Sequence, residues 1–202
     1  ADVIYPPVNV DRFNICERKD DYFFTASRLV PYKKMDLIVE AFSQMPDKKL
    51  VVIGDGSEMS KIKQKATKNI EILGYQPDAT MTDYMKKAKA FVFAAEEDFG
   101  ITPVEAQACG TPVIAFGKGG VLETIKGLDQ ESPTGLFFYE QKVDSLINAV
   151  HLFISNQNKI EPKTCRANSL RFSEQRFRDE INNYVNEKWL HFSDKKIKAT
   201  SY

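Results

Sequence analysis

The chain has 202 residues, and its 28 basic and 28 acidic side chains give a formal net charge of zero. This balance excludes the one-signed field that draws a protein to nucleic acid or to an anionic membrane. A composition of 43% hydrophobic and 28% charged residues excludes disordered and fibrous classes. No apolar run reaches the roughly 18 residues of a membrane span, and the three cysteines are too scattered for a disulfide framework or a CxxC metal site. A reducing, cytosolic setting is therefore expected.

Strand-like apolar runs alternate along the chain with segments of helical periodicity. The run Ala-Phe-Val-Phe-Ala at residues 90–94 is wholly apolar, which is typical of a strand covered on both faces and predicts a central position in the sheet. Strands are predicted at residues 22–27, 49–53, 69–73, 90–94, 112–116 and 135–138. Helices are predicted at residues 35–45, 57–68 (with Ser57 as N-cap), 81–88, 102–109, 121–126, 143–154 and 173–189.

This alternation indicates parallel strands joined by right-handed crossovers. The predicted fold class is α/β, a Rossmann-like, doubly wound parallel sheet of about six strands with C-terminal helices. The polar and basic residues 191–202 predict a frayed tail.

In an open parallel sheet, ligands bind beyond the carboxyl ends of the strands. The residues that follow the first five predicted strands are cations, acids and glycines: Arg28, Lys33 and Lys34; Gly54, Asp55 and Gly56; Gly74 and Tyr75; Glu96, Glu97, Asp98, Phe99 and Gly100; Gly117, Lys118, Gly119 and Gly120. Cations and free backbone N–H groups suit phosphates, and carboxylates suit sugar hydroxyls. This edge therefore predicts a nucleotide site.

The residues before the predicted helix 102–109 specify its start. Thr102 is a good N-cap and Pro103 is tolerated at the first helical position, so Glu105 falls at the third. Glu105 can then bind a ribose diol, or it can close a capping box by accepting a hydrogen bond from the Thr102 N–H. Both interpretations remain open.

The loop before that helix leads into its N-terminus, which attracts phosphate. Phe99, Gly100 and Ile101 form this loop, and Gly100 would let a ligand approach the backbone closely. Glu97, taken alone, is interpreted as a solvated loop acid.

The cations and glycines at the other strand ends also have two interpretations. Arg28 and Lys33 can clamp a diphosphate or be a pair of exposed charges. The Gly54-Asp55-Gly56 segment and the Lys118-Gly119-Gly120 segment can contact a ligand or be simple strand-to-helix turns.

Several classes of function are disfavoured because the residues that they require are absent or far from the candidate loops. Met59 stands where the third glycine of GxGxxG would be, so a dinucleotide oxidoreductase is disfavoured. His151 and His191 lie far from the candidate loops. Cys109 is interpreted as a small core residue, and Tyr184 with Trp189 as part of a packing stripe on one side of the last helix.

The residues from Glu97 to Val113, EDFGITPVEAQACGTPV, resemble the E-x7-E region of family 4 retaining glycosyltransferases with the GT-B fold. Four further segments are similar to that family in the same order. Residues 27–34 resemble its Arg…Lys donor-phosphate segment, residues 53–56 its second strand-to-helix turn, residues 73–75 the stretch near the nucleotide base, and residues 119–123 a further turn. The resemblance covers about residues 3–189.

The resemblance implies transfer of a sugar from a nucleotide diphosphate to an acceptor hydroxyl, with retention at the anomeric carbon and without a metal or other cofactor. It implies that Arg28 and Lys33 neutralise the leaving diphosphate, with Lys34 as the alternative lysine. It also implies that Glu97 lies near the donor sugar and Glu105 holds the ribose. The implied donor-binding set is completed by Gly54, Gly56, Tyr75, Phe99, Gly100, Ile101 and Lys118.

The resemblance is to the C-terminal, donor-binding half of such enzymes. Residues 1–19 resemble the connector from a preceding acceptor domain, residues 20–190 the donor domain, and residues 191–202 are left as a tail. We expect the 202-residue chain to bind donor without turnover. The alternative is a noncatalytic ligand-binding or interaction domain on the same fold.

The segments at residues 116–124 and 30–34 look most like mannosyltransferases of surface-polysaccharide biosynthesis, which implies GDP-mannose as donor. UDP-glucose and ADP-glucose remain alternatives. The implied acceptor is a glycan or a lipid-linked sugar, bound through the preceding domain. The implied location is the cytoplasm, with a peripheral position at the inner face of the membrane.

Overall fold

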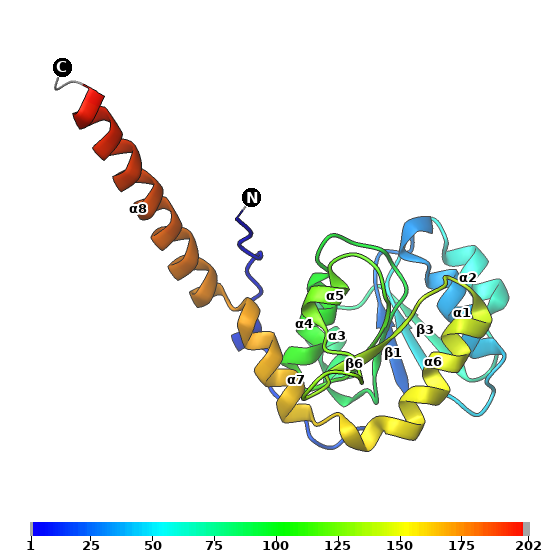
Figure 1. The fold of residues 1–202 in the computed structure, drawn as a ribbon. Helices are drawn as coiled ribbons and strands as arrows, with labels where there is room; N and C mark the ends of the chain where they lie inside the picture. The colour runs from blue at the N-terminus through cyan, green and yellow to red at the C-terminus, as the bar shows by residue number, and fades with distance from the viewer. Residues whose placement is uncertain (1, 200–202) are drawn as a thin grey trace.

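The computed structural model describes residues 2–199. Within them, six parallel strands form one sheet (Figure 1). The strands are β1 (Phe23–Ala26), β2 (Leu50–Ile53), β3 (Ile70–Gly74), β4 (Phe91–Phe93), β5 (Val113–Phe116) and β6 (Gly135–Phe138). Their order is β3-β2-β1-β4-β5-β6, and every neighbouring pair is parallel. The predicted doubly wound sheet and the central place of β4 are confirmed.

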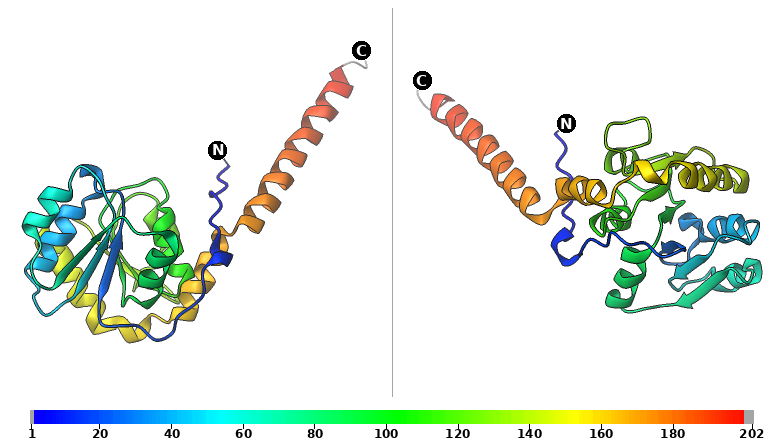
Figure 2. Two further views of the ribbon diagram at one scale, coloured as in Figure 1. Left: turned by 180° about the vertical axis from the view of Figure 1, so that it is seen from behind. Right: turned by 90° about the horizontal axis from the view of Figure 1, so that it is seen from below.

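Helices cover both faces of this sheet (Figure 2). One face carries α1 (Met35–Ser43), α2 (Met59–Lys65) and α6 (Val143–Asn156). The other face carries α3 (Asp78–Lys87), α4 (Ile101–Ala108) and α5 (Val121–Thr124). Helix α2 begins at Met59 after Glu58, so Ser57 is not its N-cap as the sequence predicted.

Strand side chains divide between two buried apolar clusters. Phe23 points into the cluster under α1 and α6, and its neighbour Phe24 points into the cluster under α3 and α4. In β2, Val52 and Val51 divide in the same way. This alternation follows from the two-residue period of a strand, and it explains why the strands read as unbroken apolar runs.

The C-terminal region differs from the sequence prediction in extent. Helix α7 (Pro162–Ser169), which was not predicted, packs against α4, and α8 (Glu174–Ala199) projects away from the sheet (Figure 1). The predicted tail is therefore helical as far as Ala199, and residues 200–202 lie outside the described residues. Residues 191–199 contain no proline or glycine that would end the helix. Short 3-10 helices complete the described structure: η1 (Val10–Arg12), η2 (Pro31–Lys33), η3 (Gln157–Lys159) and η4 (Leu170–Phe172).

The expected packing stripe on α8 does not reach the sheet. Trp189 is 64% exposed, and its ring lies 6.0 Å from that of Phe192 on the same helix. The sequence pattern showed an apolar side of α8 but not what it would face.

The segment before β1 is docked on the body of the domain. The Arg166 guanidinium of α7 donates to the carbonyls of Val10, Phe13 and Ala108 at 2.6, 3.0 and 3.1 Å. Lys19 donates from Nζ to the Lys86 carbonyl at the end of α3, at 2.8 Å. This segment is therefore held at both α4 and α3, the helices that border the candidate site.

The close packing of the turn after β2 can be tested by substituting its first glycine and a control glycine. Gly54 has φ +143°, and a Cβ on it would lie 1.9 Å from the Ser27 carbonyl oxygen. Gly74 is the matched control, because its φ of +68° is also left-handed but a Cβ there would meet nothing within 4 Å. We expect Gly74→Ala to lower the free energy of unfolding by about 1 kcal/mol, from backbone strain alone. We expect Gly54→Ala to lower it by at least about 2 kcal/mol more, because the β1–α1 loop must move.

Urea denaturation followed by circular dichroism measures both variants. Equal losses of stability in the two variants would show that the close approach of Gly54 to Ser27 does not constrain the fold.

Candidate functional site

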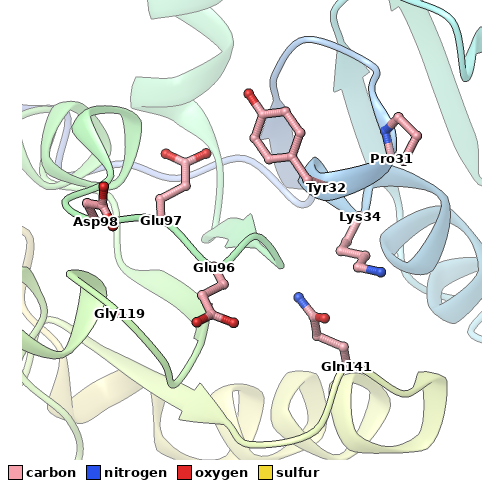
Figure 3. Close-up of a pocket in the computed structure, with 8 residues that line it drawn as sticks. All are labelled: Pro31, Tyr32, Lys34, Glu96, Glu97, Asp98, Gly119 and Gln141. Carbon is pink, nitrogen blue, oxygen red and sulfur yellow. The ribbon is translucent and has the colours of Figure 1, made fainter.

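Two hollows open at the edge of the sheet where the strands have their carboxyl ends. The Arg28 hollow has a volume of about 340 Å³ and is lined by Ala26, Ser27, Arg28, Ile53, Gly54, Asp55, Tyr75, Gln76, Asp78, Met81 and Thr102. The Glu97 hollow has a volume of about 610 Å³ and is lined by Pro31, Tyr32, Lys34, Glu96, Glu97, Asp98, Gly119 and Gln141 (Figure 3). The β1–α1 loop contributes residues to both, so the two hollows adjoin along that loop.

Lys33 and Glu97 form an ion pair between the two halves of the sheet. Lys33 ends η2 in the β1–α1 loop, and its Nζ contacts Glu97 Oε1 in the β4–α4 loop. The two side chains are 18% and 22% exposed. Strands β1 and β4 are neighbours at the point where the strand order reverses, which is where open α/β sheets bind ligands. Two of the predicted catalytic residues are thus brought together at the switch point, although 64 positions separate them.

Arg28 and Lys34, from the same β1–α1 loop as Lys33, line different hollows. Arg28 is exposed and lines its own hollow. Lys34 has a left-handed backbone, with φ 55°, at the start of α1. Its side chain and that of Gln141 lie on one side of the Glu97 hollow, across from Glu96, Glu97 and Asp98 (Figure 3). The structure therefore pairs Lys33 with a carboxylate and points Lys34 into the hollow.

Glu96 and Glu97 point in opposite directions from consecutive positions (Figure 3). Glu96 contacts the exposed Lys118 at 3.1 Å, on the β5–α5 side. Of the predicted set, Lys118 therefore lies at the outer rim, paired with an acid.

The start of α4 differs from the prediction. The helix begins at Ile101, and Gly100 is its N-cap with φ 81° and without a side-chain cap. Thr102 is consequently inside the first turn, and no capping box with Glu105 forms. The reason is that glycine adopts the left-handed conformation at this corner without strain, which turns the chain into the helix two residues earlier. The capping-box interpretation of Glu105 is wrong.

The ring of Phe99 turns into the protein. It lies 5.3 Å from the ring of Phe172 and 6.1 Å from that of Tyr5, whose hydroxyl donates to Glu123 on α5. Phe99 is partly buried, Gly100 is buried and Ile101 is exposed, and none of these three predicted residues lines either hollow.

The glycines of the candidate site are packed against neighbouring loops. A Cβ on Gly56 would lie 2.4 Å from the Leu29 carbonyl oxygen, and one on Gly119 would lie 2.4 Å from the Glu97 carbonyl oxygen. A side chain at either position would collide with the backbone of a neighbouring loop. Protein packing therefore accounts for glycine at both positions, as the turn interpretation predicts. Tyr75, in contrast, is 77% exposed at the mouth of the Arg28 hollow.

Glu105 binds a residue that the sequence did not single out. Arg12 Nη2 lies 3.3 Å from Glu105 Oε1, and Arg12 Nη1 lies 3.5 Å from Asp78 Oδ2. Burial raises the pKa of Glu105, the Arg12 charge opposes that rise, and the Asp78 charge adds to it. Arg12 was missed because no local spacing signals a contact across 93 positions of sequence. Asp78, Thr102 and Gln141 line the two hollows and were not predicted as site residues.

The cysteines and the described helices add further findings. Burial raises the pKa of the Cys109 thiol to about 12, so Cys109 is a neutral core residue as predicted. Among residues 2–193, whose side chains the structure describes, there is no group of three His, Cys, Asp or Glu side chains placed to hold a metal ion. None of the helices described is both long enough and apolar enough to span a bilayer.

Comparison with known proteins identifies the family. The glycosyl transferases group 1 family matches residues 10–171. A GDP-mannose-dependent monoacylated alpha-(1-6)-phosphatidylinositol monomannoside mannosyltransferase of Corynebacterium glutamicum is 35% identical over 135 residues, which cover 59% of this chain and 34% of that protein. An uncharacterized glycosyltransferase of Methanocaldococcus jannaschii is 33% identical over 161 residues, 73% of this chain and 44% of that protein. The chain thus spans less than half the length of both relatives.

Solved structures share the fold. Anabaena HepE, in complex with UDP and glucose, superposes with a TM-score of 0.76 at 20% identity, over 92% of this chain and 56% of that chain. The sucrose-phosphate synthase of Thermosynechococcus elongatus superposes with a TM-score of 0.79 at 20% identity, over 93% of this chain and 52% of that chain. Because the family match covers most of its length, this chain belongs to the glycosyl transferases group 1 family and has the Rossmann-like fold of GT-B glycosyltransferases.

Proposed function

We propose that the chain is the donor-binding half of a retaining glycosyltransferase that transfers mannose from GDP-mannose to an acceptor hydroxyl. The observation that carries this proposal is the Lys33–Glu97 pair at the switch point, with Arg28 in the same β1–α1 loop. Two cations and a carboxylate beside two adjoining hollows match the charges of a nucleotide diphosphate and of the sugar that leaves it.

The proposed chemistry is electrostatic. As the bond between the sugar and the diphosphate breaks, negative charge grows on the phosphate oxygens, and Arg28 and Lys33 stabilise it. Positive charge grows at the anomeric carbon, as in other glycosyl transfers, and Glu97 is the carboxylate nearest to Lys33 that can stabilise it. Lys33 therefore exchanges part of its contact with Glu97 for the phosphate when donor binds.

The nucleoside is proposed to occupy the Arg28 hollow. Its volume of about 340 Å³ suits a base and ribose, with Tyr75 at the mouth and Gly54 in the wall. Glu105 does not itself line this hollow, but Arg12 joins it to Asp78, which does, and Glu105 is proposed to accept the ribose hydroxyls. The backbone of Phe99, Gly100 and Ile101, together with Lys34 in the Glu97 hollow, would contact the phosphates and the sugar.

The donor is the finer part of the proposal. The Corynebacterium relative is named for its use of GDP-mannose, which supports a guanine nucleotide here. The HepE structure holds UDP and glucose, so UDP-glucose is the competing donor. The acceptor is proposed to be a glycan or a lipid-linked sugar of surface-polysaccharide biosynthesis, bound through a preceding domain at the cytoplasmic face of the membrane, without a metal.

Calorimetric titration of the 202-residue chain with GDP, UDP, ADP and their sugar conjugates tests the proposal. We expect GDP-mannose to bind most tightly, because base, diphosphate and sugar all find partners at one edge. Glu105→Ala is expected to weaken binding while circular dichroism shows unchanged helix content. Absence of binding at millimolar concentrations of every nucleotide would contradict a donor site in this chain and favour a noncatalytic interaction domain.

A second prediction separates the diphosphate contact from the nucleoside contact. We expect Arg28→Ala to weaken GDP binding about tenfold or more, because the charge-assisted hydrogen bonds between Arg28 and the diphosphate are lost. Guanosine has no diphosphate, so its binding should change little. Arg18→Ala is the matched control, since Arg18 is exposed but precedes β1, at the opposite edge of the sheet. Equal effects of the two substitutions on GDP affinity would place the diphosphate elsewhere.

We also expect the 202-residue chain, mixed with GDP-mannose and a candidate acceptor, to release no mannosylated product. Product formation by this chain alone would refute the assignment of acceptor binding to a preceding domain.

A further inference from the structure

We propose that Arg12, in the segment before the sheet, is a positioning residue that holds Glu105 for the ribose diol of the donor. This inference rests on the proposed function, because it assumes that Glu105 binds ribose.

The contacts of Arg12 form a fork between two helices. Nη2 contacts Glu105 Oε1 of α4 at 3.3 Å, and Nη1 contacts Asp78 Oδ2, in the first turn of α3, at 3.5 Å. Asp78 lines the Arg28 hollow, and the Glu105 side chain is only 15% exposed. One guanidinium thus fixes the Glu105 carboxylate beside the wall of the hollow proposed to hold the nucleoside.

Arg12 is itself held in place. Its guanidinium carbon lies 4.6 Å from the centre of the Phe13 ring, and Phe13 is fully buried. The carbonyls of Val10 and Phe13, on either side of Arg12, accept hydrogen bonds from Arg166 of α7. A charge on such a fixed backbone can orient a carboxylate without a large entropic cost.

The arrangement leaves one carboxylate oxygen for a ligand. Arg12 donates a hydrogen bond to Oε1 of Glu105, and no described residue donates one to Oε2 of the same carboxylate. An ionised carboxylate with a free oxygen accepts hydroxyl hydrogen bonds more strongly than a protonated one. Burial and Asp78 both favour protonation of Glu105, and Arg12 is the group that opposes them.

The other charged groups near Glu105 do not duplicate this role. Cys109, one turn along α4, is a neutral thiol because burial raises its pKa to about 12. Arg166 of α7 donates to three backbone carbonyls and lies 3.8 Å from Asp11. Arg12 is therefore the cation assigned to Glu105.

The test compares GDP with 2′,3′-dideoxy-GDP, which lacks both ribose hydroxyls, by calorimetric titration of the 202-residue chain. The ratio of the two dissociation constants measures the contribution of the ribose hydroxyls to affinity. Protonation of the phosphates affects both ligands equally, so it does not change this ratio. We expect the unmodified chain to prefer GDP by about tenfold, from charge-assisted hydrogen bonds to Glu105. We expect Arg12→Gln and Glu105→Gln to remove most of this preference, and Arg12→Lys to restore part of it.

The pH profile adds a readout that a merely structural role would not move. Loss of Arg12 raises the pKa of Glu105 further, so protonation begins at a higher pH as the pH falls. Whatever preference for GDP remains in Arg12→Gln should therefore be lost at a higher pH than the preference of the unmodified chain.

Arg171→Gln is the matched control. Arg171 also stacks on a phenylalanine, with its guanidinium carbon 5.0 Å from the Phe172 ring, and donates to Asn168 Oδ1 at 2.9 Å rather than to Glu105. Thermal unfolding midpoints of all the variants identify any that lose the fold, and Arg12→Lys keeps the test valid if Arg12→Gln is among them.

The outcomes separate the two claims. The role of Arg12 is overturned if Glu105→Gln loses the preference for GDP while folded Arg12 variants keep it. It is also overturned if Arg171→Gln loses the preference to the same extent as the Arg12 variants. Either result leaves the proposed donor site standing. If the unmodified chain binds GDP and dideoxy-GDP equally, the ribose role of Glu105 fails and the role of Arg12 fails with it.

Discussion

Parallel pairing of the strands is the constraint on which the rest of this molecule depends. Each strand must be followed by a chain that crosses back over the sheet, so every loop after a strand opens at the same edge. The order β3-β2-β1-β4-β5-β6 adds a reversal between β1 and β4. At that reversal the loops after the two neighbouring strands lead to opposite faces, and Lys33 and Glu97 meet across the opening. A charged pair at this place is a consequence of topology, not of sequence proximity.

Close backbone contacts then make the edge rigid. Gly54 and Gly56 let the β2–α2 turn rest on the backbone of Ser27 and Leu29, and Gly119 and Gly120 let the β5–α5 turn rest on the β4–α4 loop, with the Gly120 N–H donating to the Glu97 carbonyl at 2.8 Å. Both loops that carry the charged side chains are therefore braced by a neighbour. A site held in this way loses little entropy when a ligand binds.

The segment before the sheet is part of the same construction. Tyr5 packs on Phe99, and Arg12 contacts Glu105 and Asp78. In a longer protein, any change in the path of this segment would act on the β4–α4 loop and on the proposed ribose contact. This gives a physical route by which a preceding domain could influence donor binding.

The sequence predicted the sheet well because each strand carries its own signal. Runs such as residues 90–94 are apolar on both faces, and the cations, acids and glycines follow the strands directly, so the members of the edge could be named by number. What it missed depends on three-dimensional contacts. Thr102 was predicted as an N-cap, but α4 begins earlier because Gly100 adopts a left-handed conformation and caps it. The Arg12–Glu105 pair joins residues 93 positions apart, which no local pattern reveals. The resemblance to a family supplied the roles of the residues, and the geometry shows which of them can act together.

A nucleotide sugar bound at the carboxyl edge of the sheet, across the β1–β4 junction, would change the chemical shifts of the backbone amides there. Amide chemical-shift mapping by heteronuclear NMR, on the isotope-labelled chain titrated with GDP-mannose, tests this binding most directly. We expect the largest shifts at Arg28, Gly54, Gly100 and Gly119, while Lys19 and Lys89 at the opposite edge stay unchanged. Shifts confined to that opposite edge or to α8, with the carboxyl edge unperturbed, would contradict it.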